Sequence, residues 1–170
     1  MDAIAMIARL KVAFERVDSE LCYDADEYRF RWSPQVPELP NERGVYCLLS
    51  HKGSRVQKVG KADGAYGLRG RLLGYTGKKT VDKILRDKTD QRWKAAMTGE
   101  LRDQPLSVYY FITKPQPIAS PIEFADGVRE ELQCHWARSF EQYLSALFRE
   151  DYKDKKVLNV THFLLAGHGN

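Results

Sequence analysis

The segment GVYCLLSHKGSRVQKVGKADGAYGLRGRLLGY, residues 44–75, contains the pattern from which the fold of this chain is predicted. Side chains alternate with a period of two over residues 45–49 and again over residues 56–59, which is typical of β-strands. A polar turn separates the two runs, so we expect them to form a hairpin. Three glycines follow the second run, and a helix that carries two arginines is predicted over residues 68–73.

Length and composition indicate one globular domain. The chain has 170 residues, which is enough for a core of its own. Hydrophobic residues make up 43% and charged residues 29%, and no apolar run reaches membrane-spanning length, so no membrane partner is expected. The start of the chain lacks the pattern of a secretory signal. Three widely separated cysteines favour free thiols in a reducing compartment, and we therefore expect a cytoplasmic protein.

Basic residues are concentrated between Arg69 and Lys94. This segment holds nine basic and three acidic residues, whereas the net charge of the whole chain is only +4. Such a patch suits a polyanionic partner, although a solvated helix face would have the same composition. The residues expected to contact nucleic acid are Arg69, Lys78, Lys79, Lys83, Arg86 and Arg92.

An N-terminal helix and an irregular connector are predicted over residues 1–38. Apolar residues at three- and four-residue steps indicate the helix, namely Ile4, Ile7, Leu10, Phe14 and Val17. The aromatic residues of the connector either anchor a loop to the core or stack on bases, and residues 28–32 alternate as an edge strand would. Packing is the default role of both segments.

Downstream of residue 75 we predict an inserted helix, a central strand and a long final helix. The insertion covers about residues 76–104 and carries much of the basic excess. Residues 106–112 have apolar or aromatic side chains on both faces, which is typical of a strand covered on each side. The final helix is predicted to begin at Asp126. Its apolar stripe consists of Val128, Leu132, Trp136, Phe140, Tyr143, Leu144 and Leu147.

Glu141 lies on the margin of this predicted stripe, because Leu144 and Phe148 share its helical face. A partly buried carboxylate must be paired, protonated or bound to a cation. An ion pair is the ordinary structural explanation for one glutamate. The presence of Tyr46 and Arg71 upstream favours a metal site instead.

In this order, the features resemble the GIY-YIG nuclease family. Gly44-Val45-Tyr46 is similar to the first half of the family's pattern, and Lys58-Val59-Gly60 is similar to the second half, with Lys58 in place of the usual tyrosine. Arg71 falls where the family has an arginine on its first helix. Tyr75 stands where many members have histidine. Glu141 and Asn159 fall at the family's glutamate and asparagine positions.

The resemblance covers about residues 39–160 and implies an α/β (α+β) fold. A small, mainly antiparallel, three-stranded central sheet would be flanked by helices. The whole chain, residues 1–170, would then be one domain. Its parts are the N-terminal helix and connector (1–38), the nuclease core (39–160) with the basic helical insertion (76–104), and the tail (161–170).

The chemistry that the resemblance implies is metal-dependent hydrolysis of DNA. Glu141 would hold Mg²⁺ or Mn²⁺, with water and the substrate phosphate completing the coordination. Arg71 would contact the scissile phosphate. Tyr46 would accept a proton from the attacking water, and Lys58 is the alternative base.

Three residues are expected to support this chemistry. Lys61 would be a second cation near the phenol of Tyr46, and Tyr75 would touch the phosphate or assist proton transfer. Asn159 would fix the loop that follows the Glu141 helix.

The substrate is expected to be double-stranded DNA, and the enzyme to be of the restriction type. A homodimer would supply two active sites if both strands are cut. One alternative is a repair or mobile-element nuclease that recognises DNA structure. The other is a nucleic-acid-binding domain of the same fold without catalysis, because Lys58 and Tyr75 depart from the usual residues.

Overall fold

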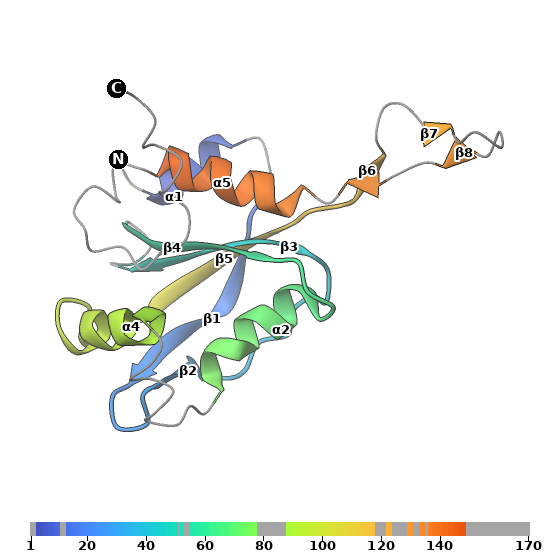
Figure 1. Cartoon of the computed structure of the whole chain (residues 1–170). Coiled ribbons are helices and arrows are strands. Elements are labelled where there is room, and N and C mark those ends of the chain that lie inside the picture. The colour runs from blue at the N-terminus through green and yellow to red at the C-terminus, as the bar shows by residue number, and fades with distance from the viewer. Residues whose placement is uncertain are drawn as a thin grey trace.

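The computed structural model of the chain contains a five-stranded antiparallel sheet with helices on both faces (Figure 1). It describes residues 3–10, 13–50, 52, 55–77, 88–117, 122–123, 129–130, 133–134 and 136–148. The strands of the sheet are β1 (Glu15–Asp24), β2 (Arg29–Ser33), β3 (Gly44–Ser50), β4 (Arg55–Ala62) and β5 (Leu106–Ile112). Their spatial order is β2-β1-β5-β3-β4.

The helices are α1 (Ala3–Arg9), α2 (Gly67–Leu73), the short 3₁₀ helix η2 (Gly74–Thr76), α4 (Lys88–Thr98) and α5 (Ala137–Leu147). Four two-residue strands complete the elements, β6 (Gln116–Pro117), β7 (Ile122–Glu123), β8 (Arg129–Glu130) and β9 (Gln133–Cys134). Figure 1 shows α1 and α5 on one face of the sheet, and α2 and α4 on the other. None of the described helices is long and apolar enough to cross a membrane.

The predicted hairpin and central strand are confirmed. β3 pairs antiparallel with β4 on one side and with β5 on the other, and all seven residues of β3 are buried. Alternate side chains of β3 enter two cores. Tyr46 and Leu48 pack in the core that contains Leu68 and Leu72 of α2. The core on the opposite face contains Val45, Cys47, Leu49, Phe140 and Leu144.

The prediction of three strands is wrong, because β1 and β2 extend the sheet beyond β5. Val17, expected in the N-terminal helix, lies in β1, and α1 ends at Arg9. Within β1 the buried residues Val17, Ser19 and Leu21 alternate with more exposed ones, which is the period of a strand. The connector is therefore largely a hairpin, and residues 29–33 do form an edge strand as expected.

The final helix is shorter than predicted. It begins at Ala137 rather than Asp126, because Gln133–Cys134 pairs with Gln116–Pro117 as a small antiparallel ladder. Tyr143, placed in the apolar stripe by its spacing, is 54% exposed. The pairing of Gln133–Cys134 with Gln116–Pro117 joins segments that are distant in the chain, so it leaves no local periodicity in the sequence.

A helix occurs in the predicted insertion, where α4 covers residues 88–98. Trp93 and Met97 of α4 are buried against the face of the sheet that α2 also covers. Residues 78–87 lie outside the described residues, and so does the predicted tail, residues 161–170.

Candidate active site

Three predicted site residues meet in one hydrogen-bonded group. The hydroxyl of Tyr46, a fully buried residue of β3, lies 2.9 Å from the hydroxyl of Tyr75. Arg71 donates from Nε to the Tyr46 hydroxyl oxygen at 3.2 Å. Arg71 is on α2, and Tyr75 is on the 3₁₀ turn that directly continues this helix. The buried phenol of Tyr46 thus holds the side chain of Arg71, a residue that is otherwise exposed to solvent.

Aromatic packing fixes the ring of Tyr75. Phe30 of β2 and Trp93 of α4 make edge-to-face contacts with it, at centroid distances of 6.0 and 6.2 Å. Lys58 Nζ lies 5.6 Å from the centroid of the same ring. Tyr75 is therefore oriented by strand, helix and lysine together, which limits the positions available to its hydroxyl.

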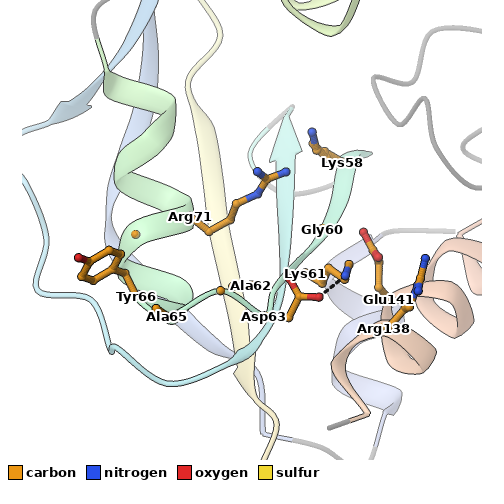
Figure 2. Close-up of a pocket in the computed structure, with 13 residues that line it drawn as sticks. Lys58, Gly60, Lys61, Ala62, Asp63, Ala65, Tyr66, Arg71, Arg138 and Glu141 are labelled. Atoms are coloured by element: carbon orange, nitrogen blue, oxygen red, sulfur yellow. Dashed lines mark hydrogen bonds and ion pairs between the residues drawn. The ribbon is translucent and has the colours of Figure 1, made fainter.

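Glu141 reaches the site from the face of the sheet opposite to the one that α2 covers (Figure 1). It is on α5 and is 6% exposed. Because β4 is one of the two edge strands, a pocket of about 590 Å³ at this edge reaches both α2 and α5. Figure 2 shows Arg71 and Glu141 on either side of β4. The lining residues are Lys58, Gly60, Lys61, Ala62, Asp63, Gly64, Ala65, Tyr66, Gly67, Gly70, Arg71, Arg138 and Glu141.

The lining of the pocket carries more positive than negative charge. Lys61 donates a hydrogen bond to Asp63, and this bond lowers the pKa of the Asp63 carboxyl. The other charged lining residues are Lys58, Arg71, Arg138 and Glu141. The charge of Lys61 is thus engaged locally, and the lining holds three further basic residues and one buried glutamate. A pocket of this charge suits a phosphate group.

Burial makes both phenols of the site harder to ionise. It raises the pKa of Tyr46, and the nearby Arg71 charge opposes this without reversing it. Burial also raises the pKa of Tyr75 well above its ordinary value, and Tyr46 adds to the effect. Tyr46 in turn raises the pKa of Arg71. Arg71, and neither phenol, is therefore the charged member of this hydrogen-bonded group.

The donor set fits a hard cation only if water and substrate supply most of the ligands. Glu141 offers a buried carboxylate in the pocket wall, while Asp63 is engaged by Lys61. Among the residues that the structure describes, no three His, Cys, Asp or Glu side chains gather as a complete protein site would require. Mg²⁺ is commonly held by one or two carboxylates with waters and substrate phosphates. The residues present fit that mode.

The structure thus brings together most of the predicted site residues, namely Tyr46, Lys58, Lys61, Arg71, Tyr75 and Glu141. Arg69 and Arg92 are exposed on α2 and α4 and do not line the pocket. Lys78, Lys79, Lys83, Arg86 and Asn159 lie outside the described residues.

Among the lining residues that were not predicted from the sequence, Arg138 and Tyr66 have side chains suited to a nucleic acid. Arg138 precedes Glu141 by three residues on α5, so helical spacing could have placed both on one face. Tyr66 lies in the glycine-rich loop before α2, and no sequence pattern distinguishes it there.

Neither a scan against protein-family profiles nor a search of curated proteins finds a match for this chain. A search of solved structures does find similar chains. One is EndoII of bacteriophage T4, solved as a point mutant, a protein whose name denotes an endonuclease. The TM-score is 0.53 at 15% sequence identity, and the match covers 90% of this chain and 98% of that chain. At this identity the likeness shows a shared fold.

Proposed function

We propose that this chain is a divalent-metal-dependent endonuclease of the GIY-YIG type that hydrolyses phosphodiester bonds of DNA. The observation that carries the proposal is the group of Tyr46, Arg71 and Tyr75, joined by hydrogen bonds, of which Arg71 lines the same net-positive pocket as the buried Glu141. The fold shared with a phage endonuclease supports the same reaction class.

Arg71 is the residue we assign to the transferred phosphate. Its Nε is engaged by Tyr46, so the guanidinium is held in one orientation with its terminal nitrogens available to the pocket. Planar paired donors match the oxygens of a phosphate and stabilise charge that develops on them. Lys58 and Arg138 would bind neighbouring phosphates electrostatically, because both line the pocket.

Glu141 is the residue we assign to the metal, Mg²⁺ or Mn²⁺. When bound, such a cation lowers the pKa of a coordinated water and polarises the phosphate. The protein supplies a single buried carboxylate for it, so metal affinity should depend on DNA.

Tyr46 acts in this proposal as a neutral phenol. Its oxygen accepts a hydrogen bond from Arg71 and shares a proton with Tyr75, while burial opposes the phenolate. In this role Tyr46 would orient the attacking water by accepting its hydrogen bond. As the bond from water to phosphorus forms and the bond to the departing alkoxide breaks, the proton lost by the water would pass through solvent to that alkoxide. Lys58, on the same side of the hairpin, is the alternative proton acceptor; in that role it would act as a neutral amine and could not also bind a phosphate as a cation.

Sequence-specific, restriction-type cleavage by a homodimer is our proposal for the biological use. The exposed arginines Arg69 and Arg92 provide phosphate contacts outside the pocket. The alternatives are a repair or mobile-element nuclease that recognises DNA structure, and a binding domain without catalysis.

The test compares plain, nicked and branched duplexes of mixed sequence with purified protein in Mg²⁺ or Mn²⁺. Discrete fragments from plain duplex, with ends that map to one sequence, support the restriction-type enzyme. Cleavage confined to nicked or branched DNA supports a structure-specific nuclease. Binding without cleavage of any DNA or RNA in either metal would overturn the enzymatic proposal.

A further inference from the structure

Tyr66 is an aromatic residue whose exposure the packing of the protein does not explain. Its exposed fraction is 77%, the highest among the large hydrophobic side chains in the described residues. Within the same part of the chain, no ring contact joins Tyr66 to another aromatic residue, whereas Tyr75 has several. The ring is therefore available to a ligand.

The backbone that carries this ring is held firmly. Tyr66 precedes the first residue of α2 and accepts a hydrogen bond from Gly70 N at 2.8 Å. The next residue, Gly67, has φ +48°, and a Cβ there would lie 2.0 Å from Asn41 O. A Cβ on Gly70 would lie 2.5 Å from Tyr66 Cβ, so the two residues are in close contact. The ring thus projects from a fixed base.

Tyr66 also lies in the pocket assigned to the scissile phosphate. It lines this pocket together with Arg71 and Glu141. Figure 2 shows Tyr66 and Glu141 far apart, with Arg71 between them in this view. An exposed aromatic ring on a fixed backbone, at a positively charged groove, is the combination that binds single nucleotides of a strand, since bases stack on rings while cations hold the phosphates.

We propose that Tyr66 stacks on a nucleobase of the strand being cut, next to the phosphate that Arg71 holds. This inference rests on the proposed function and adds a base-binding subsite to it. A base can reach the ring where the duplex is locally distorted at the cut, and in a single strand it can do so at no unpairing cost.

The test measures binding of the full-length protein by fluorescence anisotropy without divalent metal. The probes are a labelled single strand of mixed sequence and a strand of the same length whose residues are all abasic. Tyr66→Ala should weaken binding to the first strand by roughly 5- to 150-fold, the effect of removing one stacking ring. It should leave binding to the abasic strand within about twofold of the unmutated protein, because phosphate contacts persist.

Two variants serve as controls. Tyr66→Phe keeps an aromatic face and should bind both strands nearly as the unmutated protein does. Tyr143→Ala removes another exposed ring, which is 54% exposed and outside the pocket, and should change neither affinity. Alanine at residue 66 retains the Cβ that packs on Gly70, so the fold should survive.

Each contrary result overturns the inference in a recognisable way. Equal losses on both strands would mean that Tyr66 acts on the phosphate contacts and not on a base. Unchanged binding with a lower mass by light scattering would assign the ring to an interface between copies of the chain. If Tyr66→Ala binds and cuts DNA normally, the subsite is absent while the proposed function stands. If the unmutated protein binds no nucleic acid, both fall.

Discussion

Gly60 lies directly opposite Tyr46 in the β3–β4 hairpin, and the phenol of Tyr46 fills the space that a side chain at residue 60 would need. A Cβ on Gly60 would lie 2.3 Å from Tyr46 Cζ and 2.4 Å from its hydroxyl oxygen. The position of the phenol, and with it the hydrogen bond from Arg71, therefore depends on this glycine.

Gly60→Ala should displace the ring of Tyr46 and separate its hydroxyl from Arg71. We expect the free energy of unfolding to fall by about 1–3 kcal/mol, as in other overpacked cores. DNA cleavage should fall by about 100-fold, because small misplacements at a reacting centre have effects of that size. Denaturant titration and a cleavage time course measure the two effects.

The matched control is Gly74→Ala. Gly74 has helical backbone angles, and nothing lies within 4 Å of the position a Cβ would take there. This variant should stay within about 0.5 kcal/mol of the unmutated protein and keep its activity. Similar losses in both variants would show that the contact between Gly60 and Tyr46 has no special role.

Tyr75→Phe removes the hydrogen bond to Tyr46 and keeps the ring contacts with Phe30 and Trp93. We expect a loss of about 0.5–1.5 kcal/mol in stability and up to about tenfold in cleavage rate. Tyr75→Leu also removes ring contacts, each worth about 0.5–1.5 kcal/mol, and should be less stable again. If both variants are equally stable and active, the aromatic packing of Tyr75 does not position the site.

The stability of the protein should decrease in alkali partly through Tyr46. Burial raises the pKa of Tyr46 above its ordinary value of 10.0, so the folded state retains this proton more strongly than the unfolded state does. The stabilisation is complete below pH 10 and is lost as pH rises through the pKa of the folded state. Urea titrations at a series of pH values give the free energy of unfolding. From neutral to strongly alkaline pH, this free energy should therefore fall more steeply for the unmutated protein than for Tyr46→Phe. Parallel curves would contradict the assignment.

Arg71→Lys preserves the charge but not the planar donors. Arg71 bonds Tyr46 through Nε and still has two terminal nitrogens for a phosphate, whereas lysine has a single side-chain nitrogen and cannot do both. The cleavage rate should fall roughly 100-fold, and DNA affinity should change by only a few fold. Arg102→Lys, at an exposed arginine after α4, is the control and should behave as the unmutated protein. An equally large effect at both positions would point to charge in general.

The parts of the fold that the sequence predicted correctly are those with local periodicity. The β3–β4 hairpin, the arginine helix and β5 each show their period within a few residues, and most of the candidate site lies on them. Val17 was misassigned because its spacing from Phe14 also suits a helix. What holds β1 in place is pairing with β5, including a hydrogen bond of 2.5 Å from the Tyr110 hydroxyl to Glu15. Partners 95 residues apart leave no local pattern.

The same limit applies within the site. Residue types and order indicated Tyr46, Arg71 and Glu141, but the raised pKa of the Tyr46 phenol follows from burial that only packing reveals. The sequence also does not reveal that the phenol of Tyr46 occupies the space beside Gly60, because this is a contact between facing strands.

The central claim is that Glu141 supports metal-dependent cleavage, and Glu141→Gln tests it most directly. Glutamine keeps the volume of this buried side chain but is a poor ligand for a hard cation. Cleavage of duplex DNA in Mg²⁺ is compared with binding of the same DNA, alongside a chelator control and Glu38→Gln at an exposed glutamate. We predict that Glu141→Gln binds DNA within a few fold of the unmutated protein but yields no fragments, whereas Glu38→Gln cuts normally. Cleavage by Glu141→Gln at the unmutated rate would contradict the claim.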